Sequence, residues 1–79
     1  MAAKAFLLIT TVAGKSNRVV AAIKQLGEEG IKSVDSVTGP YDIIAVIEGE
    51  ALQEIGELVT GKINSVADIS RVVTCLAIQ

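Results

Sequence analysis

Apolar residues recur along this chain with two different periods, and each change of period marks a new element. Two segments repeat apolar residues at spacings of three and four, which is typical of an amphipathic helix. Four shorter segments are rich in β-branched and aliphatic residues and are bounded by Gly, Pro or Asn, which is typical of strands. The predicted order is strand, helix, strand, strand, helix, strand, over residues 4–12, 15–27, 31–38, 41–48, 50–63 and 66–78.

The polarity of the strands predicts how they are arranged. The first and third are apolar on both faces, which suits the centre of a sheet, whereas the second is polar and suits an edge. With right-handed crossovers, this order gives the α+β, ferredoxin-like βαββαβ sandwich. We therefore expect a four-stranded antiparallel sheet in the order 4-1-3-2, with both helices on one face.

Two helices on one face leave the apolar residues of the other face uncovered. An exposed apolar patch of that size is unusual on a monomer, and a chain of 79 residues builds only a small core of its own. We therefore expect a homodimer in which one sheet packs on the other, of the dimeric α+β barrel type. The apolar fourth strand is a further candidate contact.

Composition narrows the class of protein. Residues 1–79 suffice for one domain, and the net charge of −2 with seven scattered basic residues argues against direct nucleic-acid binding. No apolar stretch approaches the roughly 20 residues that span a bilayer, so no membrane partner is expected. The lone Cys75 fits a reducing compartment, which predicts a cytoplasmic protein, and is expected to be a small buried hydrophobe.

Residues typical of catalysis are missing from the sequence. The chain has no His, and neither a Cys pair nor a Cys/His cluster that would hold a metal. Gly14-Lys15-Ser16 resembles the end of a phosphate-binding loop, but that motif requires a glycine at the position of Ile9. We interpret the segment as a turn with Ser16 as helix N-cap. No enzyme activity, catalytic residue, metal or cofactor is predicted.

The turn between the second and third strands, Thr38-Gly39-Pro40-Tyr41-Asp42, concentrates unusual residues where an apolar strand begins. One interpretation is structural: the Asp42 carboxylate accepts hydrogen bonds from nearby backbone N–H groups. The other is functional, because free backbone donors and a carboxylate at a subunit interface can form a pocket for a small zwitterion. Residue patterns alone leave both interpretations open.

A family resemblance extends over residues 4–78. It rests on the element order and on three short patterns, namely Ala13-Gly14-Lys15 after the first strand, Gly39-x-Tyr41-Asp42 at the turn, and Val66-x5-Val72-Val73-Thr74 near the end. With these features the chain resembles the effector-binding (RAM) domain of Lrp/AsnC transcription regulators, in a stand-alone form without the helix-turn-helix domain.

The resemblance implies dimers that assemble further into a ring of dimers, with an amino-acid effector bound between dimers. The effector-binding residues that it implies are Gly39, Pro40, Tyr41 and Asp42 at the turn, with Thr74 on the last strand. It also implies regulation of transcription, with full-length Lrp/AsnC regulators as candidate partners. The alternatives are an ACT-like regulatory module with contacts in loop 13–17, a small dimeric α+β barrel enzyme, and a structural subunit without ligand.

Overall fold

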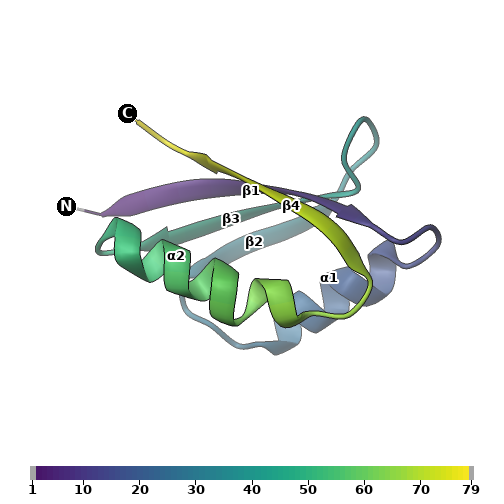
Figure 1. The fold of residues 1–79 in the computed structure, drawn as a ribbon, viewed down its shortest axis with the longest axis horizontal. Helices are drawn as coiled ribbons and strands as arrows, with labels where there is room; N and C mark the ends of the chain where they lie inside the picture. The colour runs from purple at the N-terminus through teal and green to yellow at the C-terminus, as the bar shows by residue number, and fades with distance from the viewer. Residues whose placement is uncertain (1, 79) are drawn as a thin grey trace.

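The elements of the protein follow the periods of its sequence. The computed structural model describes residues 2–78, and Figure 1 shows a sheet with two helices beneath it. The elements are β1 (Ala3–Thr11), α1 (Ser16–Gln25), β2 (Ile31–Ser36), β3 (Ile43–Gly49), α2 (Leu52–Gly61), the short 3-10 helix η1 (Ile63–Ser65) and β4 (Ile69–Leu76). Each of the six predicted elements is present, with ends shifted by a few residues.

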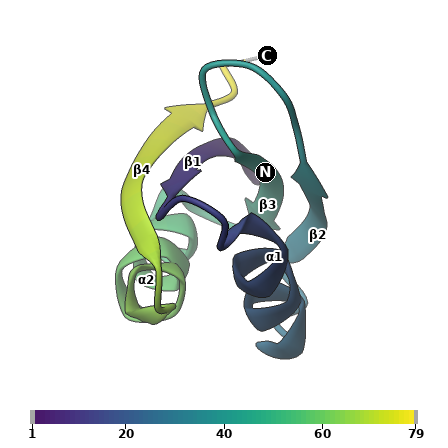
Figure 2. The ribbon, with the colours of Figure 1, turned by 90° about the vertical axis from the view of Figure 1, so that its right-hand side faces the viewer.

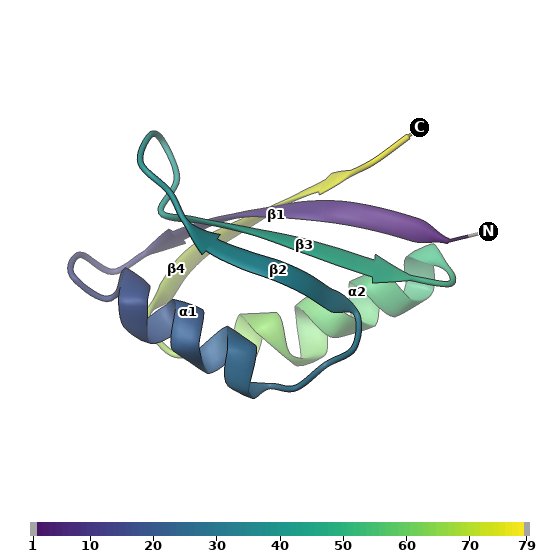
Figure 3. The same cartoon turned by 180° about the vertical axis from the view of Figure 1, so that it is seen from behind.

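The four strands form one antiparallel sheet in the order β2-β3-β1-β4. Read from the other edge this is the order 4-1-3-2, so the prediction of a ferredoxin-like α+β fold is confirmed. Both helices lie on the same side of the sheet, as the view from behind also shows (Figure 3). The strands that are apolar on both faces, β1 and β3, occupy the centre, and the polar β2 is an edge strand.

The core lies between the sheet and the helices. Alternate residues of the central strands point toward the helices, and each strand contributes three of them to the core. The helices and η1 contribute side chains spaced along one face of each. The buried residues are Ala5, Leu7, Ile9, Val19, Ile23, Val34, Ile43, Ala45, Ile47, Ile55 and Ile63. Each of the larger ones contributes about 1.5–3 kcal/mol by its burial.

The remaining side chains of the central strands point away from the helices and form what we call the open face. No helix or strand within residues 2–78 packs on this face (Figure 2). Its apolar members, aligned by the strand register, are Phe6, Leu8, Ile44, Val46, Val73 and Cys75. Phe6 is 37% exposed although it sits in a central strand, so this surface is apolar and uncovered in a single chain.

Two local predictions need correction. Cys75 is exposed rather than buried, because it lies opposite Phe6 on the open face, which no element within residues 2–78 covers. Ser16 is the first helical residue rather than the N-cap, and Lys15 occupies the cap position without a side-chain hydrogen bond. The turn is closed instead by the Lys15 N–H, which donates to the Val12 carbonyl at 3.0 Å.

Two glycines with different backbone conformations provide a stability test. Gly56 lies inside α2 with open space where a Cβ would stand, whereas Gly27 ends α1 with a φ of 66°. We expect Gly56→Ala to stabilise the fold by about 0.5–1 kcal/mol, because alanine loses less backbone entropy in a helix. Gly27→Ala should destabilise it by about 1 kcal/mol, because φ is left-handed there. Urea denaturation of both variants measures the two effects, and equal signs would contradict this assignment.

Candidate functional site

The turn between β2 and β3 rises from the sheet on the side opposite the helices (Figures 1 and 2). Its base is closed by the Val37 N–H, which donates to the Asp42 carbonyl at 3.0 Å. Gly39 adopts a φ of 137°, a conformation that side chains disfavour, and a Cβ there would meet open space. Gly39 and Pro40 are exposed, while Tyr41 and Asp42 are half-buried. The turn therefore presents its backbone on the side of the open face.

Asp42 fastens this turn to the end of β1. Its Oδ2 accepts a hydrogen bond from the Thr11 N–H at 2.8 Å and lies 3.4 Å from the Thr11 hydroxyl. The Asp42 N–H in turn donates to the Ile9 carbonyl at 2.9 Å. The register of β1 with β4 shifts between Thr10 and Thr11, so the carboxylate binds a backbone donor at a bulge. A carboxylate acceptor makes this bond stronger than one between neutral groups.

The structural interpretation of Asp42 is therefore correct in its chemistry, but its partner is not local. Thr11 lies 31 residues away in the chain and meets Asp42 only through the pairing of β1 with β3. Sequence reasoning missed Thr11 as a residue of the site. Its only signal is a polar pair, Thr10-Thr11, at the end of an apolar strand, and many strands end in this way.

The turn keeps unused hydrogen-bonding capacity. Within residues 2–78, the second carboxylate oxygen of Asp42, Oδ1, accepts no hydrogen bond, and the N–H groups of Gly39 and Tyr41 donate none. Pro40 between them has no N–H to offer. An acceptor with negative charge and two backbone donors thus lie within a few residues of one another. A ligand with a cationic group and an anionic group matches this combination.

Thr74 lies apart from the turn in the single chain. It pairs with Leu7 and so points to the helix side of the sheet, at the edge formed by β4. There it borders an open apolar groove of about 460 Å³ between β4 and α2, with Leu52, Ile55, Gly56, Val59, Thr60 and Leu76. The fold brings Gly39, Pro40, Tyr41 and Asp42 together but does not bring Thr74 to them.

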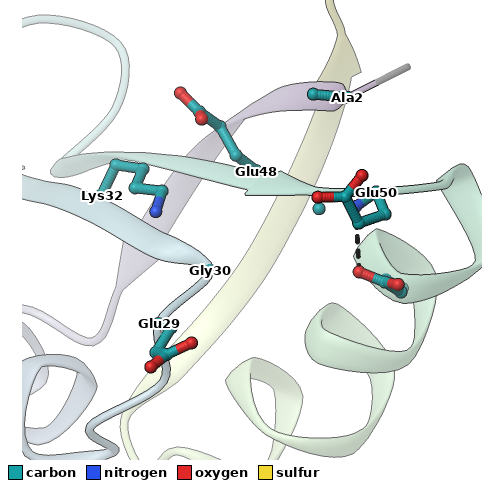
Figure 4. A pocket seen from close by; sticks show the side chains of 8 residues that line it. Ala2, Glu29, Gly30, Lys32, Glu48 and Glu50 are labelled. Carbon is teal, nitrogen blue, oxygen red and sulfur yellow. Dashed lines mark hydrogen bonds between the residues drawn. The ribbon is translucent and has the colours of Figure 1, made fainter.

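A second hollow, of about 320 Å³, lies at the far end of the sheet (Figure 4). Its lining is Ala2, Glu29, Gly30, Lys32, Glu48, Gly49, Glu50 and Glu54, and the Glu50 N–H donates to Glu54 Oε1 at 2.9 Å. Four carboxylates beside a single lysine repel the carboxylate of an amino acid. Within residues 2–78, no group of His, Cys, Asp and Glu could hold a metal ion. This hollow is therefore a poor site for a zwitterion.

No helix within residues 2–78 is long and apolar enough to cross a membrane. A regulatory, ligand-binding fold is thus favoured by three features together: the ferredoxin-like sheet, the open face and the polar turn. Residues 4–79 match the family model described as the Lrp/AsnC ligand binding domain. The chain belongs to this family, as the resemblance in its sequence predicts.

Solved structures agree with this assignment. The TTHA0845 protein from Thermus thermophilus is 31% identical with a TM-score of 0.88, over 98% of this chain and 94% of that one. The protein FFRP-DM1 is 33% identical with a TM-score of 0.84, over 96% and 99% of the two chains. No curated protein matches the chain significantly in sequence.

A more distant neighbour shares the fold alone. It is a transcriptional regulator from Neisseria meningitidis, solved as a complex with L-methionine. Its identity to this chain is 14% and its TM-score is 0.81, over 98% of this chain and 50% of that one. The family and its fold neighbours are regulators rather than enzymes, which confirms the expectation that this chain is not an enzyme.

The bond between Asp42 and Thr11 can be tested on its own. We expect Asp42→Ala to lower the free energy of unfolding by about 1–2 kcal/mol, because it leaves the Thr11 N–H without its charged acceptor. Amide hydrogen exchange of Thr11 should accelerate more than that of Leu7 in the middle of the same strand. The exposed Glu29 is a control, and Glu29→Ala should change neither quantity. Unchanged exchange at Thr11 in Asp42→Ala would contradict the assignment.

Proposed function

We propose that this chain is a single regulatory domain of the Lrp/AsnC type that binds a small amino acid at residues 39–42. The observation that carries the proposal is the Asp42 carboxylate, which is fixed through Oδ2 by Thr11 and keeps Oδ1 available beside two unused backbone N–H groups. Membership of the Lrp/AsnC ligand-binding family supports it. The L-methionine complex of a protein with the same fold suggests the class of ligand.

The chemistry of an amino acid matches the two ends of the turn. Its α-ammonium group would pair with Asp42 Oδ1, and its α-carboxylate would accept hydrogen bonds from the Gly39 and Tyr41 N–H groups. The missing Cβ of Gly39 lets a ligand approach the backbone closely. Pro40 donates no hydrogen bond but restricts the backbone of the turn. Thr74 is a weaker member of this proposal, reached only through contact with another chain.

Dimerisation through the open face is part of the same proposal. The apolar residues of that face lose contact with water when a second sheet covers them, at about 25 cal/mol per Å². The turn rises on the same side as the open face, so a second copy would lie beside residues 39–42. A ligand at this place would contact two chains, and further assembly into a ring of dimers would extend such contacts.

Regulation would then follow from binding without any chemical reaction. An effector held between chains stabilises the assembly that contacts it better, by no more than its difference in affinity for the two states. In the cytoplasm, the domain would act by associating with full-length Lrp/AsnC regulators or with another partner. The net charge of −2 and the scattered basic residues favour a protein partner over direct binding to DNA.

The dimer is tested by placing a charge on the open face. We expect Val46→Asp to turn the dimer into a monomer of about half the mass at micromolar concentration, because the carboxylate would be buried without a partner. Sedimentation velocity measures the change. Leu52→Asp is the matched control on the helix side, where 59% of Leu52 is exposed, and should leave the dimer intact. An unmodified protein that sediments as a monomer would rule out the dimer.

Effector binding is tested by removing the charge of Asp42 while keeping its hydrogen bond. In Asp42→Asn, the amide oxygen can still accept from the Thr11 N–H, but the side chain has no charge to pair with an ammonium group. We expect titration calorimetry with L-methionine and the other amino acids to detect at least one ligand, and Asp42→Asn to weaken it at least about tenfold, or 1.4 kcal/mol. Normal hydrogen exchange at Thr11 would exclude local unfolding as the cause.

The alternatives give different results in the same titration. Binding that is lost in Lys15→Ala and unchanged in Asp42→Asn would favour an ACT-like module, whose ligand contacts loop 13–17. Absence of binding by all twenty amino acids would favour a structural subunit. An enzyme of the dimeric α+β barrel type is disfavoured, because the chain has no His and no buried polar side chain within residues 2–78.

A further inference from the structure

Charged residues surround the apolar centre of the open face, and the strand register fixes their positions. On the central strands, Lys4 lies directly opposite Glu48 at one end of the face. Lys4 also covers the ring of Phe6, with Nζ 5.2 Å from the ring centroid. On the edge strands, Asp35 of β2 and Arg71 of β4 point to the same face and are exposed. The two edges of the face therefore carry opposite charges.

The register also gives the rows that run across the sheet. One row holds Asp35, Ile44, Leu8 and Val73, in strand order from β2 to β4. Arg71 lies two residues along β4 from this row, which is about 7 Å at 3.3–3.4 Å per residue. An arginine side chain is long enough to cover such an offset. Asp35 and Arg71 are thus at nearly the same height, on opposite edges of the sheet.

Two copies that pack face to face with twofold symmetry have two aligned arrangements. If the axis runs parallel to the strands, β2 of one copy lies over β4 of the other, and β3 lies over β1. If the axis runs across the strands, each edge strand lies over its own counterpart. The first arrangement places Asp35 near the partner's Arg71 and Glu48 near the partner's Lys4. The second places Asp35 on the edge that carries the partner's Asp35, and Arg71 on the edge that carries the partner's Arg71.

We infer that the twofold axis of the dimer runs parallel to the strands, and that Asp35 pairs with the partner's Arg71 at both edges of the interface. This inference rests on the proposed dimer through the open face. Complementary charge selects the arrangement, because unlike charges attract across the rim while like charges on one edge repel. The partner that this surface fits is therefore a second copy of the chain in one orientation, and aligned sheets that cross at about 30° keep these contacts.

Charge reversal at the two edges tests the pairing. Asp35→Lys and Arg71→Glu should each lower the dimer association constant about tenfold, because each change affects two symmetric pairs. The double variant should return to within about threefold of the unmodified protein, since the pair is restored with its charges exchanged. Analytical ultracentrifugation over a dilution series measures all three. Matched controls on the helix side are Glu29→Lys and Lys24→Glu, which change the net charge equally and should leave the constant unchanged.

The outcomes separate this inference from the dimer beneath it. An unmodified monomer would refute the proposed dimer itself. A dimer that neither single change weakens, or a double variant as weak as the two single losses combined, would leave the dimer standing and overturn its orientation. Recovery in the double variant, with unchanged controls, would support the direct pair.

Chemical crosslinking gives a second, independent measurement of the orientation. Ser33 and Cys75 share one row with Val46 and Phe6, on opposite edges of the open face. With the axis parallel to the strands, Cys75 lies over the partner's residue 33, about 10 Å away, whereas the two Cys75 residues are separated by three strand spacings, about 14 Å, and by the gap between the sheets. A short bis-maleimide should therefore crosslink the Ser33→Cys variant into dimers and leave the unmodified protein largely uncrosslinked. The reverse result would overturn the inferred axis.

Discussion

A sheet that is apolar on both faces and covered by helices on only one governs the rest of this structure. The core between sheet and helices holds eleven buried apolar residues, and it leaves Phe6, Leu8 and Val46 on the other face in contact with water. For a chain of this size such a surface both lowers solubility and provides free energy for association. The proposed dimer, its orientation and the interface position of the effector all depend on this face.

The bond from Asp42 to Thr11 links that constraint to the proposed site. The carboxylate uses one oxygen for a backbone donor at the bulge of β1, and this holds the turn upright on the side of the open face. The same residue therefore has a structural and a proposed binding role, divided between its two oxygens. Replacement by alanine removes both roles, whereas asparagine removes the charge alone, so the two variants report on different properties.

Periodicity predicted most of the fold because it is a local property of the chain. Strand faces follow a period of two and helix faces a period near 3.6, so six elements and the two central strands could be read from the residues. The ends were less accurate, as with Ser16, because a backbone hydrogen bond from Lys15 replaces the side-chain cap. The exposure of Cys75 was misjudged because a strand pattern does not say which of its faces is covered.

The amino-acid sequence by itself determined the order of the elements, the centre of the sheet, the family resemblance and the turn at 38–42. Only the tertiary structure decided that Asp42 meets Thr11, that Thr74 lies across the sheet from the turn, and that Asp35 and Arg71 occupy opposite edges at similar height. The reason is physical: these relations join residues tens of positions apart. They are set by strand register, which depends on the packing of the whole sheet rather than on any one segment.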